Sequence, residues 1–292
     1  EVSMRSSATG TPQISVLPAR SRVCSMPPES ASPGSEPDNI EHIMSFYRIT
    51  SHKSLHFATL HNYGCTFRCC FCSYRLRSGA DGAPGLSYPP PKRFLSVAEI
   101  EAALRKAAPE KVYFMGGEPT TAKELPELLA FAKRELGAVT RLGHTNGSRL
   151  PLPDLDGANV GFKAWSDDLH RRITGREKAL IYDNFSAACD AGLDMAANMV
   201  FVPGLVGLAE FEGLMKFLSR IGCDIPFHIM GYIPVPGQPY RRPGDAEMDE
   251  VLALCRSYLK RVDSSHLTSE EALDLKRRDH RFQVETIAGE TE

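Results

Sequence analysis

The sequence lacks a long hydrophobic run, a large excess of charge of either sign, and a high density of cysteine. Its longest apolar runs, such as Met195 to Val202, are far shorter than the roughly 20 residues that a membrane-spanning helix needs. The 34 Lys and Arg residues against 36 Asp and Glu residues leave a net charge of -2, so no overall positive field attracts a polyanion. We therefore expect a soluble protein whose partners include neither a membrane nor a nucleic acid.

The 8 cysteines are too few for a disulfide scaffold in a chain of 292 residues, and four of them fall between Cys65 and Cys72. Clustered thiols of this kind indicate metal ligation in a reducing compartment. The first forty residues contain no continuous apolar segment of the length found in a secretory signal. The expected location is the cytoplasm.

Composition and periodicity divide the chain into three regions. Residues 1–43 are rich in Ser and Pro and have no helical or strand period, so we expect a disordered N-terminal extension. Residues 44–262 contain the main folded domain. Residues 263–292 form a C-terminal extension, in which Thr268 and Glu271 have capping-box spacing for one short helix.

In the main domain, short β-rich runs alternate with segments of helical period, which is typical of βα units around a parallel sheet. Six units can be counted. The expected strands are Leu55 to His61, Lys111 to Met115, Arg141 to Thr145, Asn159 to Trp165, Met195 to Val202 and Phe227 to Ile233. The expected helices are Arg68 to Arg77, Ser96 to Ala107, Ala122 to Leu136, Glu177 to Ala191, Leu208 to Ile221 and Asp245 to Val262.

Cys65, Cys69 and Cys72 have the spacing C-x3-C-x2-C directly after the first expected strand. A structural zinc site takes four ligands, usually from two separated pairs, and no second pair follows in the sequence. A [4Fe-4S] cluster held by three thiolates keeps one iron open for an exogenous ligand, which a chemically active cluster requires. Cys70 could be a fourth ligand or a small buried apolar residue.

This motif, with the aromatic Phe71 before its last cysteine, resembles the signature of the radical S-adenosylmethionine (radical SAM) superfamily. The run Met115-Gly116-Gly117-Glu118-Pro119 is similar to the GGEP motif of that superfamily and ends the second expected strand. In barrel-type α/β folds the chemistry lies at the C-terminal ends of the strands. The resemblance implies a partial (β/α)6 barrel of the radical SAM type, an α/β fold.

The resemblance also implies the cofactors, a [4Fe-4S] cluster and S-adenosylmethionine (SAM), and a reaction in which a 5'-deoxyadenosyl radical abstracts hydrogen from substrate. Cys65, Cys69 and Cys72 would be the catalytic cluster ligands. The expected SAM-binding residues are Phe71 at the adenine, Gly116, Gly117, Glu118 and Pro119 at the methionine amino group, Lys163 at the carboxylate, and Asn146, Asn198 and Tyr232 at the ribose or adenine.

Within the superfamily, residues 144–147, 161–175 and 198–204 resemble the glycyl-radical-enzyme activases, such as the activator of pyruvate formate-lyase. That activator has acidic residues, which serve a monovalent cation, where this chain has His144 and Gly161. The expected function is therefore an activase-like oxidoreductase, with a flavodoxin or ferredoxin as electron donor and a glycyl radical enzyme as protein substrate. The alternatives are a radical SAM enzyme acting on a small molecule or peptide and, more remotely, a zinc-binding structural module.

Overall fold

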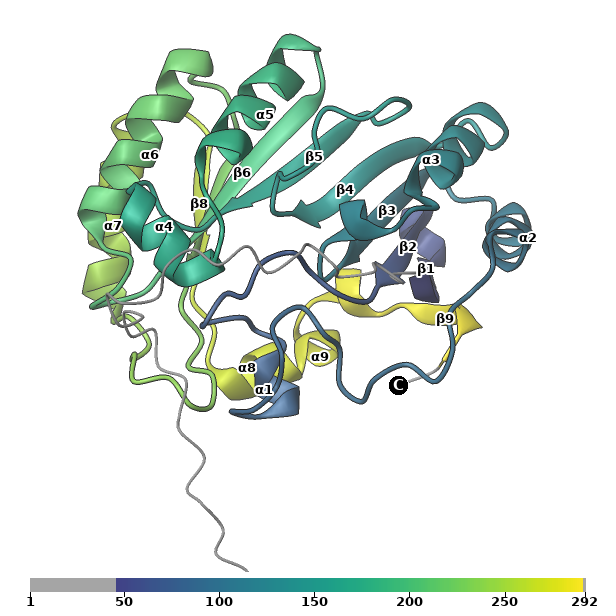
Figure 1. Cartoon of the computed structure of the whole chain (residues 1–292), viewed down its shortest axis with the longest axis horizontal. Coiled ribbons are helices and arrows are strands. Elements are labelled where there is room, and N and C mark those ends of the chain that lie inside the picture. The colour runs from purple at the N-terminus through teal and green to yellow at the C-terminus, as the bar shows by residue number, and fades with distance from the viewer. Residues whose placement is uncertain (1–45, 291–292) are drawn as a thin grey trace, which may run out of the picture.

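A computed structural model describes residues 46–290, so the extension expected over residues 1–43 lies outside the described residues. One nine-stranded sheet runs through the described part, in the order β8-β7-β6-β5-β4-β3-β2-β1-β9 (Figure 1). The strands are β1 (Phe46–His52), β2 (Phe57–Asn62), β3 (Lys111–Gly116), β4 (Val139–Thr145), β5 (Gly157–Phe162), β6 (Asp194–Phe201), β7 (Phe227–Gly231), β8 (Val262–Ser265) and β9 (Glu285–Gly289).

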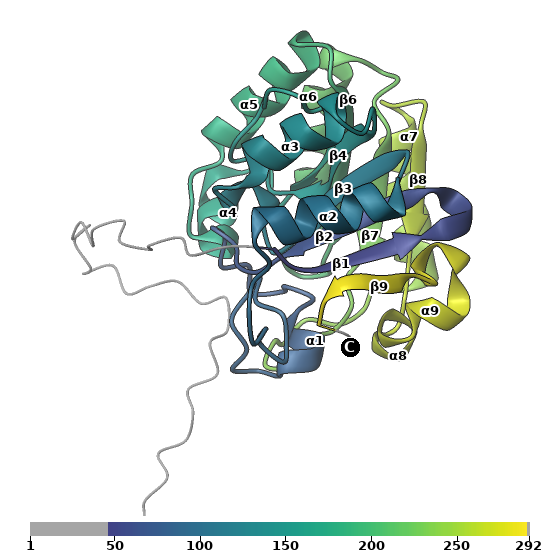
Figure 2. The same cartoon turned by 90° about the vertical axis from the view of Figure 1, so that its right-hand side faces the viewer.

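Seven consecutive strands, β2 to β8, are parallel, whereas β1 and β9 are added antiparallel at one edge. Since β8 and β9 are the two ends of the strand order, the sheet curves without closing. The architecture is the α/β partial barrel expected from the sequence. Figure 2 shows β9 beside β1, which places the C-terminal extension on the edge of the main sheet.

The helices are α1 (Arg75–Ser78), α2 (Val97–Ala107), α3 (Leu125–Arg134), α4 (Asp167–Thr174), α5 (Ala179–Asp190), α6 (Leu208–Ile221), α7 (Asp245–Arg256), α8 (Ser269–Leu273) and α9 (Leu275–Arg278). The longer helices line the outer side of the curved sheet, and α1, α8 and α9 lie where the curve opens (Figure 1). Side-chain alternation explains this arrangement: Val160 and Phe162 of β5 are buried under the helices, while Gly161 lines the cavity on the opposite side.

Four local expectations need correction. The helix expected over Asp245 to Val262 ends at Arg256, and Val262 already belongs to β8. The expected six strands correspond to β2 to β7, but β8 adds a seventh parallel strand, and β1 precedes them as an unforeseen antiparallel strand. The helix expected over Arg68 to Arg77 is only the short α1. The preceding residues form turns, in which the amide of Cys72 donates to the carbonyl of Cys69, because this segment wraps its cysteines around a cavity.

The C-terminal extension contains the short helix expected there, α8. The Thr268 hydroxyl accepts from the Glu271 amide, and the Glu271 carboxylate accepts from the Thr268 amide, so the expected capping box is present. Within the described residues, no helix combines the length and the apolar character needed to cross a membrane.

Candidate functional site

A cavity of about 460 Å³ lies at the C-terminal ends of the parallel strands. All three predicted cluster ligands, Cys65, Cys69 and Cys72, line it. So do seven of the nine residues predicted to bind SAM: Phe71, Gly116, Gly117, Asn146, Lys163, Asn198 and Tyr232. Glu118 and Pro119 are not among its lining residues. The sequence motifs thus meet in space, although more than 160 residues separate the first from the last.

The cysteine segment begins after β2; Cys69 is buried, and Cys65 and Cys72 are half-buried. Burial raises the pKa of the Cys65 and Cys69 thiols to about 12. Both are therefore protonated at neutral pH, and a metal centre would bind them with release of the protons. Cys70 is buried in the hydrophobic core and is not among the residues that line the cavity.

The arrangement of these thiols distinguishes between kinds of metal centre. Among residues 46–290, no group of three or more His, Cys, Asp or Glu side chains is placed to hold a single metal ion. A tetrahedral zinc would bring every thiolate to about 2.3 Å from one ion. A [4Fe-4S] cluster takes one thiolate at each of three irons and so spaces them around a larger group. Three thiols spread around one cavity fit the cluster better than a zinc ion.

The two glycines at the end of β3, Gly116 and Gly117, allow three chain segments to meet at the cavity wall. A Cβ on Gly116 would lie 2.2 Å from the carbonyl oxygen of Asn62, and one on Gly117 would lie 2.0 Å from that of Gly64. Gly116 also has φ +127°, which L side chains rarely adopt. The amide of Glu118 donates to the carbonyl of Gly64 at 2.7 Å. Glycine is therefore required to seat the end of β3 against the start of the cysteine segment.

The carboxyl of Glu118 is held by hydrogen bonds within the protein. It is completely buried and accepts hydrogen bonds from the Thr120 amide and hydroxyl, the Thr145 hydroxyl and the Asn146 amide. Pro119, also buried, begins the 3-10 turn Pro119–Thr121. The side chain of Glu118 thus fixes the shape of the turn, and only Gly116 and Gly117 of this motif face the cavity.

Lys163 and Asn198 converge over Gly161 on the β5–β6 side of the cavity. A Cβ on Gly161 would stand 2.8 Å from Lys163 Nζ and 3.2 Å from Asn198 Oδ1, so the absence of a side chain leaves room for both polar groups. Asn198 Nδ2 donates to Asn159 Oδ1 at 2.8 Å, which orients its oxygen toward the lysine. The half-buried ammonium is well placed to meet a carboxylate.

The remaining predicted contacts are partly engaged within the protein. Asn146 Nδ2 donates to Thr66 Oγ1 at 2.9 Å, which links the end of β4 to the cysteine segment. The Tyr232 hydroxyl accepts from the Val235 amide at 3.1 Å. Its ring packs edge-on against Phe71, with 6.5 Å between the centroids. Phe71 and Tyr232 together form an aromatic wall of the cavity.

Two further residues that line the cavity, His144 and Gly85, were not among those predicted for the site. The imidazole of His144 faces the cavity and is exposed to the solvent in it. Desolvation by the surrounding protein, with the nearby Lys163 and His228, lowers its pKa to about 4. Its position in a strand end was the only signal in the sequence. Gly85 lies in the loop after α1, which has no periodicity that could have placed it at the cavity.

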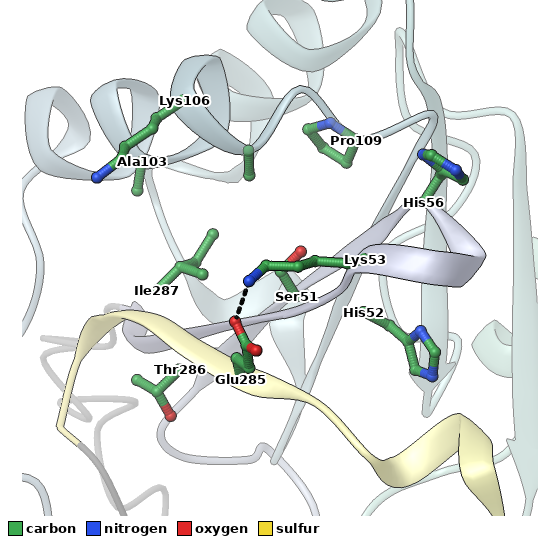
Figure 3. Close-up of a pocket in the computed structure, with 11 residues that line it drawn as sticks. Ser51, His52, Lys53, His56, Ala103, Lys106, Pro109, Glu285, Thr286 and Ile287 are labelled. Atoms are coloured by element: carbon green, nitrogen blue, oxygen red, sulfur yellow. Dashed lines mark ion pairs between the residues drawn. The ribbon is translucent and has the colours of Figure 1, made fainter.

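A second cavity, of about 620 Å³, lies between β1, α2 and β9. Figure 3 shows Lys53 paired with Glu285 at its edge; the two side-chain atoms are 2.8 Å apart. His56 immediately precedes β2, whereas Cys65 follows the other end of that strand. This cavity therefore lies at the opposite end of the strands from the cysteines and contains none of the predicted site residues.

Comparison with known proteins agrees with this site. Residues 59–218, more than half of the chain, match the Radical SAM superfamily. A protein of Methanocaldococcus jannaschii, provisionally named a glycyl-radical enzyme activating enzyme, is 26% identical over 228 residues, which cover 75% of this chain and 82% of that protein. The GTP 3',8-cyclase of Pectobacterium atrosepticum is 36% identical over 140 residues, but the match covers only 44% of this chain and 40% of the cyclase.

Among solved structures, Streptococcus suis SuiB bound to S-adenosylmethionine superposes with a TM-score of 0.55 at 18% identity, over 73% of this chain and 50% of SuiB. At this identity, the likeness to SuiB shows a shared fold and nothing more. The family match over residues 59–218, together with the order of the motifs and the cavity where they meet, carries the assignment of the family. The chain belongs to the radical SAM superfamily, and its cofactors are accordingly a [4Fe-4S] cluster and SAM.

Proposed function

We propose that this radical SAM enzyme is an activase, which abstracts a hydrogen atom from a glycine residue of a glycyl radical enzyme. The observation that supports it most is the meeting of Cys65, Cys69 and Cys72 with Gly116, Gly117 and Lys163 around one cavity. The similarity to the Methanocaldococcus jannaschii protein, which extends over most of both chains, supports the choice of substrate.

In this proposal the three cysteines hold three irons of the cluster, and the strand end at Gly116 and Gly117 meets the methionine part of SAM. When bound and reduced, the cluster and SAM supply a 5'-deoxyadenosyl radical that removes a hydrogen atom from substrate. Lys163 binds the carboxylate of SAM through a charge-assisted hydrogen bond. Met115, Val200 and Met230 line the cavity and keep water from the reacting groups.

A protein substrate needs access to this cavity for a segment of its own chain. The sheet curves without closing, because β8 and β9 do not pair, and this open side supports entry of an extended glycine loop. The single electron for each reaction would come from a small protein such as a flavodoxin or ferredoxin. The 5'-deoxyadenosyl radical would leave as 5'-deoxyadenosine, and the radical would remain on the glycine Cα.

The test uses anaerobic protein loaded with iron and sulfide, reduced with dithionite and mixed with SAM. A purified glycyl radical enzyme of the pyruvate formate-lyase type is the probe. We expect 5'-deoxyadenosine together with the electron paramagnetic resonance signal of a glycyl radical, and neither product from a Cys65→Ala, Cys69→Ala, Cys72→Ala variant. A loaded enzyme that forms 5'-deoxyadenosine with GTP and no glycyl radical would exclude the activase proposal.

A small anionic substrate is a second candidate, favoured by the residues around the cavity. The ammonium of Lys163 lines it together with the imidazoles of His61 and His144, which can donate hydrogen bonds, and none of its described lining residues is Asp or Glu. The cyclases that resemble part of this chain take GTP, as their name states. GTP in place of the protein probe therefore separates the two candidates in the same assay, because only the correct substrate should stimulate formation of 5'-deoxyadenosine.

A further inference from the structure

The loop over residues 79–93, between α1 and α2, reaches the cysteine cavity through Pro84 and Gly85. Gly85 is buried and has φ +74°, a conformation that strongly favours glycine. Its amide points at the cysteine segment and donates a hydrogen bond to Cys72 Sγ over 3.3 Å. Thirteen residues separate the two along the chain, so this contact belongs to the folded loop and not to the cysteine motif.

The position of Gly85 is fixed from three directions. Its carbonyl accepts a hydrogen bond from the Gly64 amide at 3.1 Å, directly before Cys65. A Cβ on Gly85 would lie 2.2 Å from Cys65 Cβ, and a Cβ on Gly117 would lie 2.3 Å from the Gly85 carbonyl oxygen. Gly85 is therefore held between two of the segments that line the cavity, and there is no room for a side chain.

The loop itself is anchored on both sides of Gly85. Before it, the guanidinium of the buried Arg75 donates to the Gly82 carbonyl at 3.1 Å. After it, the Lys92 amide donates to the Glu290 carboxylate at 2.6 Å, next to β9. These contacts keep the amide of Gly85 directed at the sulfur before any cofactor is bound, and they connect the C-terminal extension to the loop that covers the thiols.

Hydrogen bonds to ligand sulfurs are one of the main factors that set the reduction potential of an iron–sulfur cluster. Reduction adds one negative charge to the cluster. An amide N–H directed at a ligand sulfur stabilises that charge, so the donor raises the potential. Among the described residues, two backbone amides donate to the three thiols. These are Gly85 to Cys72 and Phe67 to Cys65, the latter over 3.4 Å.

We infer that Gly85 is a positioning residue for the cluster: its amide donates to the Cys72 thiolate and raises the reduction potential, which makes the cluster easier to reduce for the cleavage of SAM. This inference rests on the proposed cluster site but is independent of the identity of the substrate. The loop that contains Gly85 lies outside the C-x3-C-x2-C and GGEP motifs.

The test compares Gly85→Ala with Gly79→Ala. Gly79 lies in the same loop and also has a positive φ, +82°, but its Cβ would meet nothing within 4 Å, so the control places alanine at a positive φ without the collision. In Gly85→Ala, the collision with Cys65 displaces the amide from Cys72. We expect the ratio of reduced to oxidised cluster at a fixed potential to fall about tenfold, equivalent to about 59 mV for one electron. Gly79→Ala should match the wild type. The ratio is measured by electron paramagnetic resonance during a redox titration without SAM.

A second measurement needs no substitution. Of the two backbone amides that donate to the thiols, that of Gly85 is the glycine amide and the other is that of Phe67. Protein labelled with [15N]glycine should therefore show a 15N hyperfine coupling to the reduced cluster. An unchanged potential in Gly85→Ala, or no coupling in the wild type, overturns the inference and leaves the proposed function intact. If Gly85→Ala does not fold, the wild-type coupling decides. A wild-type protein that binds no cluster overturns both the inference about Gly85 and the proposed function.

Discussion

Glu118, two residues after β3, accepts a hydrogen bond from the backbone amide of Asn146, which directly follows β4. The other oxygen of the same carboxyl accepts from Thr120 and Thr145. Burial raises the pKa of Glu118, and these four donors oppose that shift by stabilising the charged form. The carboxyl thus joins two neighbouring strand ends beneath the cavity wall.

Replacing Glu118 with Gln should destabilise the fold although the shape of the side chain is kept. The new NH2 group would face the Asn146 amide, or after rotation the three donors on the other side, so at least one buried donor loses its acceptor. The expected loss is about 1–3 kcal/mol in the free energy of unfolding, measured with urea. Glu99→Gln is the control, because Glu99 caps α2 in an exposed position. Equal effects of the two substitutions would contradict the role assigned to Glu118.

The cysteines should differ sharply in what their removal does. Cys69→Ser, which changes a buried thiol at the cavity, should reduce the affinity for the cluster at least about tenfold. Cys189→Ser on α5 changes a half-buried thiol outside the cavity and should retain the iron content of the wild type. Iron and acid-labile sulfide are measured after reconstitution. Retention of full iron by Cys69→Ser would remove Cys69 from the ligand set.

His144 predicts a pH dependence of stability. Its pKa is lowered to about 4 in the folded protein, against about 6.5 in an unfolded chain. Between these values only the unfolded state binds the proton, so the contribution of His144 is complete above about pH 6.5 and is lost as the pH falls toward 4. Because the imidazole is open to the cavity, solvent reduces the effect, and we expect a change of only about 1–2 °C in the unfolding midpoint.

The measurement for His144 is the difference between wild type and His144→Gln in thermal unfolding at pH 7.5 and pH 5. The substitution removes the titrating group, so the wild type should lose more stability than the variant over this range. Other groups that titrate are common to both proteins and cancel in the difference. Identical losses would show that His144 does not change its protonation on unfolding.

Some parts of this structure could be predicted from sequence and others could not, for physical reasons. Strands β2 to β7 were predicted because their apolar residues are buried under helices. β8, with the sequence VDSS, has one apolar residue and lies at the sheet edge, so it gave no such signal. The hydrogen bond from Gly85 to Cys72 depends on how an aperiodic loop folds back, and no local pattern encodes that contact.

The only tryptophan, Trp165, shows how a glycine can be required inside a helix. A Cβ on Gly213, in the middle of α6, would lie 2.1 Å from the Trp165 indole, and the Lys178 ammonium lies 4.2 Å from the ring centroid. Alanine is usually favoured over glycine in a helix by about 1 kcal/mol, but overpacking costs about 1–3 kcal/mol. Because the collision is with a ring already in contact with Lys178, we expect an overpacking cost in the upper part of this range, which leaves a net cost of about 1–2 kcal/mol for Gly213→Ala.

Gly222→Ala at the end of the same helix is the control, since its Cβ would meet only Ile225 at 3.9 Å. Urea unfolding followed by the fluorescence of Trp165 measures both variants. The native emission should change in Gly213→Ala alone, because only there must the indole move. A Gly213→Ala protein that is more stable than the wild type, with unchanged emission, would mean that helix propensity outweighs the packing of Trp165 against α6.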